Sequence, residues 1–230
     1  EVSVQQPDDN DLMTSVLYRF ANPDFVQRLQ RGYLPHFADA GARRVMDLGA
    51  GRGIFLKLLA EQGMEAVGVD SNLEQVEACR AQGFTVHHDD VLSFLDRAGG
   101  GDEAGRFDGV FCSHLVEHLS GADAVRLVNG AASLLAPGGR LLLVTPNVSN
   151  PEVWSHTFWL DPTHVRPYPR PLLESLLEAR GLKVVASFDD SRTRRKYGGW
   201  DALRLPVDLL RYGVNLLTGM DAVVVGELPG

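Results

Sequence analysis

Cysteine, long apolar runs and excess positive charge are all scarce in this sequence. The two cysteines, Cys79 and Cys112, are too few for a disulfide framework and indicate buried free thiols in a reducing compartment. No apolar run reaches the roughly 18 residues of a membrane-spanning helix, and no signal-peptide pattern opens the chain. The net charge of −8 argues against a general nucleic-acid-binding surface. We therefore expect a cytoplasmic protein with no transmembrane segment and no nucleic-acid partner.

The sequence does have the composition of an ordinary globular domain. Its 230 residues are 44% hydrophobic and 23% charged, which is enough apolar material for one core. Strand-length apolar runs alternate with helical patterns, which predicts an α/β fold with a mainly parallel sheet and helices on both faces. The expected strands lie near residues 44–49, 66–70, 84–88, 107–112, 141–144, 182–188 and 222–226, and the clearest helices near 54–62, 122–135 and 169–180.

A glycine-rich turn follows the first expected strand. The run from Val45 to Gly53 reads VMDLGAGRG and is followed by a helical pattern, which predicts strand, tight turn and helix. Glycine lets the backbone turn sharply and approach a ligand, and the helix N-terminus behind it offers unpaired N–H groups. Asp70 ends the second strand, where an acid can accept hydrogen bonds from both ribose hydroxyls. These features predict a nucleoside-containing cofactor.

The spacing of the glycines distinguishes between cofactors. A dinucleotide fingerprint that starts at Gly49 needs glycine at position 54, but that residue is Ile54, which disfavours a nicotinamide dehydrogenase. The pattern D-x-G-x-G-x-G from Asp47 instead resembles motif I of the class I S-adenosylmethionine (SAM)-dependent methyltransferases. A glycine-rich turn of some other α/β domain is the alternative.

That resemblance implies a Rossmann-like, seven-stranded, mainly parallel sheet whose last strand runs antiparallel between the fifth and sixth. It implies SAM as the cofactor and S-adenosylhomocysteine as the product, with no metal expected. The residues it implies for cofactor binding are Asp47, Gly49, Ala50, Gly51, Gly53, Asp70, Ser71, Asp89, Asp90, Val91, Ser113 and His114.

Two acids precede the expected helix that starts at Val91. By the same resemblance one of them holds the adenine amino group, and Asp90 matches that position better than Asp89. The alternative is that both carboxylates cap the helix. Ser71 and Glu74 have capping-box spacing at the start of the preceding helix.

Histidines stand where the fourth strand ends, in the run HLVEH from His114 to His118. Methyl transfer to an alcohol needs a base, and a neutral imidazole titrates near working pH. His114 is the first candidate for that base and His164 the second. A phosphate acceptor would instead need cations, such as Arg166 or the cluster from Arg192 to Lys196. His114, Glu117 and His118 also have H-x-x-E-H spacing, so a divalent metal there is an alternative, although we favour loop orientation and cofactor contact.

A long segment over residues 147–170 follows the fifth strand, and its length indicates a functional loop. Together with TPN at 145–147, the run FWLDPTHVRPYP at 158–169 resembles one branch of the family. That branch includes the methyltransferase domain of the bifunctional methyltransferase–kinase that terminates O-antigen chains, which implies a sugar, or a phosphate on a sugar, as acceptor. A loop that only locks itself by hydrogen bonds is the alternative. The expected substrate-binding residues are Glu117, His118, Trp159, Asp161, His164, Arg166 and Tyr168.

The predicted organisation is an N-terminal helical cap at 1–40 and a SAM-binding domain at 41–230. The domain carries the acceptor-side loop 147–170 and an insertion at 190–220 with a basic start and an amphipathic helix near 206–217. We expect a SAM-dependent methyltransferase with an oxygen acceptor, a sugar or glycan of polysaccharide biosynthesis. One alternative acceptor is a small natural product or quinone-like molecule in an apolar pocket. The alternative from a different class is a SAM-sensing protein without turnover.

Overall fold

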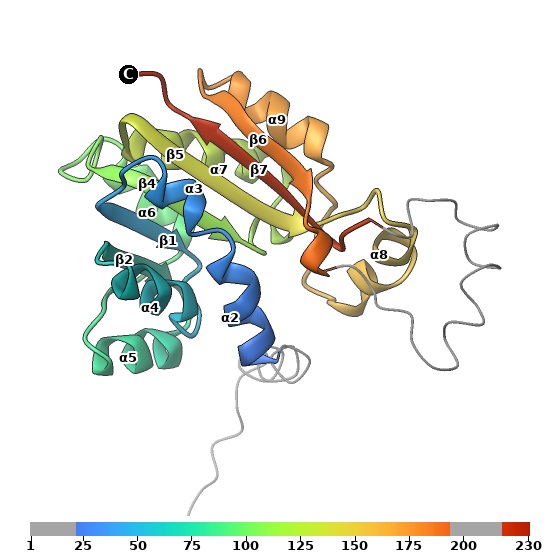
Figure 1. The fold of residues 1–230 in the computed structure, drawn as a ribbon, viewed down its shortest axis with the longest axis horizontal. Helices are drawn as coiled ribbons and strands as arrows, with labels where there is room; N and C mark the ends of the chain where they lie inside the picture. Colours follow the sequence, from blue (N-terminus) through green and yellow to red (C-terminus); the bar gives the residue numbers. More distant parts are fainter. Residues whose placement is uncertain (1–21, 194–217) are drawn as a thin grey trace, which may run out of the picture.

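The computed structural model describes residues 22–193 and 218–230 (Figure 1). Its sheet has seven strands in the order β3-β2-β1-β4-β5-β7-β6. β7 pairs antiparallel with β5 and β6, and the other neighbouring strands are parallel. This confirms the predicted Rossmann-like sheet and its antiparallel last strand. The strands are β1 (Arg44–Leu48), β2 (Glu65–Asp70), β3 (Thr85–His88), β4 (Phe107–Ser113), β5 (Leu135–Pro146), β6 (Lys183–Asp189) and β7 (Asp221–Glu227).

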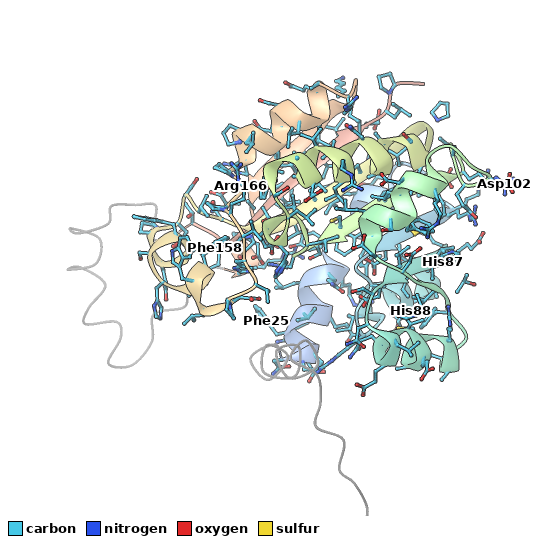
Figure 2. All side chains as sticks on the ribbon, turned by 180° about the vertical axis from the view of Figure 1, so that it is seen from behind. Phe25, His87, His88, Asp102, Phe158 and Arg166 are labelled. Atoms are coloured by element: carbon cyan, nitrogen blue, oxygen red, sulfur yellow. The ribbon has the colours of Figure 1, made fainter. Side chains whose placement is uncertain are left out.

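Helices cover both faces of the sheet, so its central strands are apolar on both sides (Figures 1 and 2). The core on one face is formed with α3, α4 and α5, with α2 packed against α4, and the core on the other face is formed with α6, α7 and α9. The longer helices are α2 (Pro23–Arg31), α4 (Ile54–Glu61), α5 (Leu73–Ala81), α6 (Val91–Ala98), α7 (Gly121–Leu134) and α9 (Arg170–Glu178). The shorter ones are α3 (Pro35–Ala38), α8 (Pro151–Ser155), η1 (Val116–His118), η2 (Thr157–Leu160) and η3 (Ser191–Thr193).

Some local predictions need correction. Asn72, not Ser71, caps α5, because its side chain accepts from the Gln75 N–H at 3.0 Å. β5 begins directly after α7 instead of at residue 141, and its pairing with β4 shifts register between Phe107 and Gly109. The predicted helical region before the sheet is two helices in its described part, since Pro35 starts α3.

Parts of the predicted cap and insertion lie outside the described residues. These are residues 1–21 and 194–217, which include Tyr18, the basic residues Arg194, Arg195 and Lys196, and the amphipathic helix predicted near 206–217. Among the described residues, the helices are all too short or too polar to cross a bilayer.

The fold brings several chain segments to one edge of the sheet. The parallel strands β1, β2, β4 and β5 all end at that edge, where open α/β sheets bind ligands. Because β7 is antiparallel, it starts there, with Asp221 opposite Pro146.

Candidate active site

The turn after β1 is held in an unusual backbone conformation. Gly49, Gly51 and Gly53 have φ values of 80°, 50° and 70°, in the left-handed region that favours glycine. A Cβ on Gly53 would lie 2.7 Å from the sulfur of Cys79, so this position has no room for a side chain. The turn therefore brings bare backbone to the edge of the sheet, as the sequence predicted.

Asp70 fastens this turn to the end of β2. Its Oδ2 accepts from the Gly51 N–H at 2.7 Å, and its Oδ1 accepts from the Asn72 N–H at 2.8 Å. A carboxylate offers about four lone-pair sites, so both oxygens retain capacity for further donors such as ribose hydroxyls. The residues of this turn fit a nucleoside-containing ligand.

Asp47 lies beneath the turn and is 3% exposed. Burial, and secondly the Asp70 carboxylate, raise the pKa of Asp47 to about 8. The side chain is therefore largely neutral at pH 7 and can donate a hydrogen bond toward the turn.

The acids after β3 have structural partners. Asp90 caps α6 by accepting from the Ser93 N–H at 2.9 Å, and the Asp89 carboxylate pairs with Arg97. The alternative of helix capping therefore holds for Asp90 and not for Asp89. A contact between either acid and adenine stays a prediction. Val91 is buried as the first residue of α6, and the Ser71 carbonyl lies 3.1 Å from the His88 ring.

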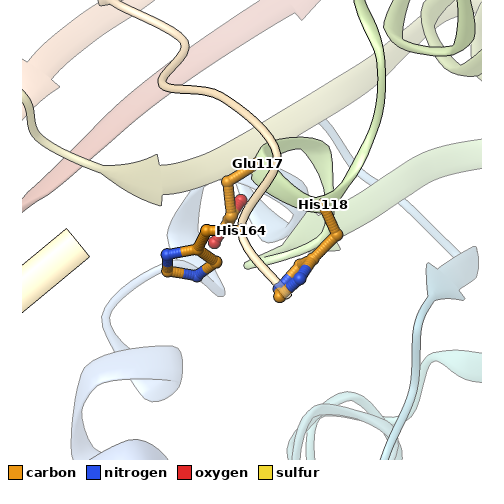
Figure 3. Close-up of side chains that lie close together, drawn as sticks. All are labelled: Glu117, His118 and His164. Carbon is orange, nitrogen blue, oxygen red and sulfur yellow. The ribbon is translucent and has the colours of Figure 1, made fainter. Parts of the chain in front are cut away.

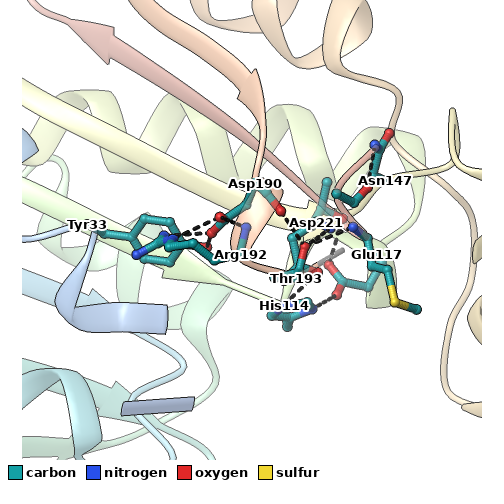
Figure 4. Close-up of polar contacts among 11 residues, drawn as sticks. Tyr33, His114, Glu117, Asn147, Asp190, Arg192, Thr193 and Asp221 are labelled. Carbon is teal, nitrogen blue, oxygen red and sulfur yellow. Dashed lines mark hydrogen bonds and ion pairs between the residues drawn. The ribbon is translucent and has the colours of Figure 1, made fainter. Parts of the chain in front are cut away.

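His114 follows Ser113, the last residue of β4, and adopts a strained backbone conformation. Its φ of 52° is the one positive value among the described non-glycine residues, and such strain clusters at functional sites. Its Nδ1–H donates to Glu117 Oε1 at 3.1 Å, and its Nε2 lies 3.5 Å from Asp221 Oδ1 (Figure 4). Both ring nitrogens therefore face carboxylates.

Those two carboxylates determine the charge of His114. Loss of hydration lowers the pKa of His114, but Asp221 and then Glu117 outweigh it and hold that pKa well above its ordinary value. The side chain is 47% exposed, so the ion pairs dominate over burial. These contacts favour the charged form of His114 and so disfavour its role as a neutral base, which stays a prediction. Glu117 is three residues away in the sequence, whereas Asp221 comes beside His114 only in the folded sheet.

Asp221 is a site residue that sequence reasoning missed. Its N–H donates to Thr193 Oγ1 at 3.0 Å, and that hydroxyl donates to the Asp190 carbonyl at 2.7 Å. No local motif marks Asp221, because only the antiparallel pairing of β7 brings it beside His114. Its position could have been expected from the family topology alone.

A second polar cluster ties α2 and α3 to the end of β6 (Figure 4). Asp190 accepts from the Tyr33 hydroxyl at 2.8 Å and from Arg192 at 2.6 Å. Burial raises the pKa of Asp190, but hydrogen bonds from Arg192 and then Tyr33 outweigh it and lower that pKa. Burial also raises the pKa of Tyr33. Arg192, predicted as a cation for phosphate, is occupied here by Asp190.

Glu117 is fully buried, and both of its oxygens have partners. Oε2 accepts from the Thr145 hydroxyl at 3.0 Å, while Oε1 accepts from His114. Burial raises the pKa of Glu117, but His114 outweighs it and the net shift is downward, so the group is a carboxylate. The Glu117 carbonyl accepts from Val165 N–H at 2.8 Å, which fixes the acceptor-side loop.

The acceptor-side loop is braced from within. Asp161 Oδ1 accepts from the Thr163 N–H at 2.8 Å and from its hydroxyl at 2.5 Å. The His164 Nδ1–H donates to the Phe158 carbonyl at 2.6 Å, and the His164 ring packs 4.5 Å from the Phe158 ring. This supports the alternative of a self-locked loop for Asp161. The His164 Nε2 lies 3.7 Å from Asp161 Oδ2, beyond hydrogen-bond distance.

The other predicted substrate residues differ in exposure. Trp159 is 60% exposed, whereas Tyr168 is buried, with its hydroxyl 2.9 Å from the carbonyls of Leu119 and Ser120. The Arg166 guanidinium lies 5.1 Å from the Tyr168 ring centre. Trp159 and Arg166 can reach a ligand at the surface, whereas Tyr168 has a structural position in the core.

The sheet order and the antiparallel β7 define the class I SAM-dependent methyltransferase fold. A methyltransferase domain family matches residues 18–187, well over half of the sequence. The chain belongs to that family.

Relatives and solved structures agree with this assignment. The ubiquinone biosynthesis O-methyltransferase of Psychrobacter cryohalolentis is 30% identical over 135 residues, which cover 55% of this chain and 51% of that protein. The enzyme of the same name from Xanthomonas axonopodis pv. citri is 37% identical over 112 residues, which cover 47% of this chain and 44% of that protein. The chain thus spans about half the length of the curated relatives it matches.

Among solved structures, a SAM-dependent methyltransferase from Archaeoglobus fulgidus is 27% identical with a TM-score of 0.71, and the match covers 90% of this chain and 95% of that one. A Burkholderia thailandensis 1,6-didemethyltoxoflavin-N1-methyltransferase with bound S-adenosylhomocysteine has a TM-score of 0.61 at 17% identity, over 100% of this chain and 93% of that one, and shares the fold.

Proposed function

We propose that this chain transfers a methyl group from SAM to a hydroxyl oxygen of a small organic acceptor. The observation that carries the proposal is the meeting of two segments at the carboxyl edge of the sheet. A Cβ at Gly49 would lie 3.9 Å from the Leu115 side chain, so the glycine turn and the His114–His118 segment are in contact. A ligand held on the turn would lie beside both.

The turn suits the nucleoside part of SAM. Three left-handed glycines leave its backbone bare, and the Asp70 carboxylate stands at the end of the neighbouring strand. SAM supplies a methyl group on a positively charged sulfur. The chain mainly has to position this group and the acceptor oxygen in line, since proximity and orientation account for much of the barrier reduction in such transfers.

The opposite side of the site offers groups for the acceptor. His164 offers Nε2, because its Nδ1–H is committed to the Phe158 carbonyl and its Nε2 lies 3.7 Å from Asp161 Oδ2, beyond hydrogen-bond distance. Trp154, Trp159 and Leu160 are exposed in this segment, and the Trp159 ring N–H donates to the Trp154 carbonyl at 2.6 Å. These exposed apolar side chains favour an acceptor with an apolar ring, which agrees with relatives named ubiquinone biosynthesis O-methyltransferases. His164 would act on the acceptor oxygen through Nε2.

A glycan acceptor is the second candidate. The run at residues 158–169 resembles the O-antigen branch, and the exposed Arg166 could meet a phosphate. The relatives found favour the small-molecule acceptor.

A transfer assay with methyl-labelled SAM distinguishes these candidates. Phenols and quinols with vicinal hydroxyls are offered alongside sugars and phosphosugars. We expect label in the phenolic acceptors, with turnover reduced at least tenfold in His164→Gln, a change of about 1.4 kcal/mol, and unchanged in His156→Gln. His156 is a matched control because it is exposed on the same loop. Label only in sugars would support the glycan, and SAM binding with no label in any acceptor would support a sensing protein.

A further inference from the structure

Three side chains from two separate segments converge on the acceptor side (Figure 3). Glu117 and His118 come from η1, and His164 comes from the loop after η2. Each offers one possible ligand atom, and these atoms lie within 4.8 Å of one another. A tetrahedral ion with bonds of about 2.1 Å keeps its ligand atoms about 3.4 Å apart. Side-chain rotations that move each ligand atom by about 1 Å would bring the three atoms to that separation.

We infer that Glu117, His118 and His164 form a binding site for a divalent transition-metal ion such as Zn²⁺. Two imidazoles and one carboxylate suit Zn²⁺ and its neighbours, whereas Mg²⁺ and Ca²⁺ prefer sets of oxygen ligands. Three protein ligands leave at least one coordination position open, as in catalytic and not in closed structural sites.

The hydrogen bonds of His164 prepare it as a ligand. A carbonyl oxygen only accepts, so the contact with Phe158 O places the proton of the neutral ring on Nδ1. Nε2 then carries the lone pair. Metal-binding histidines almost always donate their other N–H to a carbonyl or carboxylate in this way.

His118 is prepared through Thr163 and Asp161. The Thr163 hydroxyl donates its one proton to Asp161 Oδ1 at 2.5 Å, so its oxygen accepts from His118 Nδ1–H at 2.9 Å. This leaves the lone pair of His118 on Nε2. The motif residues Asp161 and Thr163 thereby acquire a role, because they orient a ligand through a carboxylate–hydroxyl–imidazole chain.

Glu117 supplies the negative charge of the site. It is a buried carboxylate, and His114 and Thr145 donate one hydrogen bond to each of its oxygens. Further lone pairs remain for an ion. The set differs from the sequence-based alternative of His114, Glu117 and His118, because both nitrogens of His114 face carboxylates, Nδ1 at 3.1 Å from Glu117 and Nε2 at 3.5 Å from Asp221.

An ion here would bind the acceptor hydroxyl at its open position, a role that rests on the methyl transfer proposed above. Coordination to a divalent ion makes a bound hydroxyl more acidic, so His164 would act on the acceptor oxygen through the ion and no neutral histidine base is needed. The hydroxyl loses its proton to solvent and its oxygen bonds to the methyl carbon. The sulfur keeps the electron pair of the broken C–S bond.

Metal binding is tested first without SAM or acceptor. The full chain, freed of any affinity tag and dialysed against chelator, is titrated with Co²⁺ by visible absorption and with Zn²⁺ by calorimetry. We expect one ion per chain in the wild type and in His156→Gln. His118→Gln and His164→Gln should each bind at least tenfold more weakly, as should Glu117→Gln. The site would be overturned if the wild type bound no stoichiometric ion. It would also be overturned if His118→Gln and His164→Gln both bound the ion as tightly as the wild type.

The outcome is separable from the methyltransferase proposal. SAM affinity and transfer are measured on the same metal-free and metal-loaded samples. We expect metal removal to lower kcat or raise the KM of the acceptor at least tenfold, with SAM affinity unchanged. Transfer that is equally fast without metal would contradict the ion's role while leaving methyl transfer intact.

Discussion

Among single residues, Gly53 shows most directly that the glycine turn leaves no room for a side chain. Two effects oppose any substitution there, the positive φ and the 2.7 Å approach to Cys79. We predict that Gly53→Ala lowers the free energy of unfolding by about 2–4 kcal/mol, from backbone strain and overpacking together. Chemical denaturation measures this.

Gly63 supplies the matched control. It also has a positive φ, of 75°, but a Cβ there would meet nothing within 4 Å. Gly63→Ala should therefore cost only the backbone term, about 1 kcal/mol. Equal losses in the two variants would show that the contact with Cys79 is unimportant.

The raised pKa of Asp47 predicts how the stability of the fold depends on pH. Its pKa rises from an ordinary 3.8 to about 8 on folding, so between these values the native state binds more protons than the unfolded state. Stability therefore falls as pH rises from about 4 to 8, and below pH 4 the effect vanishes because both states are protonated. As pH rises through this window, the free energy of unfolding of Asp47→Asn should increase relative to that of the wild type, by up to about 1.4 kcal/mol per pH unit.

Denaturation at pH 4.5, 6 and 7.5 measures that difference. Asp102→Asn, a change at an exposed acid on the turn before β4, controls for the loss of one negative charge. A difference between Asp47→Asn and wild type that stays constant over this range would contradict a buried, neutral Asp47.

Site residues could be predicted from the sequence where a short, continuous motif marks them. The glycine turn and Asp70 could be predicted because a fixed spacing after an apolar run determines where they lie. The charge of His114 could not, because it depends on Asp221, which only the completed sheet brings within 3.5 Å. His118 and His164 were predicted together as substrate-binding residues, whereas the metal alternative grouped His118 with His114 and Glu117.

At the scale of elements, the stability of helix α6 depends on its N-cap residue, Asp90. Asp90 accepts from the Ser93 N–H, so Asp90→Ala should lower the free energy of unfolding by about 1 kcal/mol. Asp90→Ser keeps a capping oxygen and should be close to wild type in stability.

The same pair of variants tests whether Asp90 also touches the adenine. If it does, both variants lose SAM affinity, although only Asp90→Ala loses stability. If SAM affinity follows stability, with Asp90→Ser unchanged in both, the carboxylate only caps the helix. Titration calorimetry and thermal melts on the two variants separate these outcomes.

Glycine and proline marked some element boundaries and obscured others. The helix predicted near 54–62 ends at Glu61, two residues before Gly63 with its φ of 75°, whereas the break in the first helical region at Pro35 was missed. The early start of β5 was missed, because Pro137 and Gly138 look like a helix stop followed by a loop, yet pairing with β4 and β7 extends the strand around them.

At the scale of the whole molecule, topology assembles the site. Alternating strands and helices predicted a parallel sheet, whose carboxyl edge must collect the turn, Asp70 and His114. The antiparallel β7 adds Asp221 to that edge, and the 147–170 loop adds His164. The acceptor could not be predicted in the same way, because its contacts depend on side-chain orientations within a loop.

The most direct test of the account is calorimetric titration of the chain with SAM and S-adenosylhomocysteine, in the wild type, Asp70→Asn and Asp102→Asn. The account predicts saturable binding at one site in the wild type and in Asp102→Asn. Asp70→Asn should bind at least tenfold more weakly, about 1.4 kcal/mol, because it loses charge-assisted hydrogen bonds while staying folded by circular dichroism. Absence of binding to either ligand in the folded wild type would contradict the central claim.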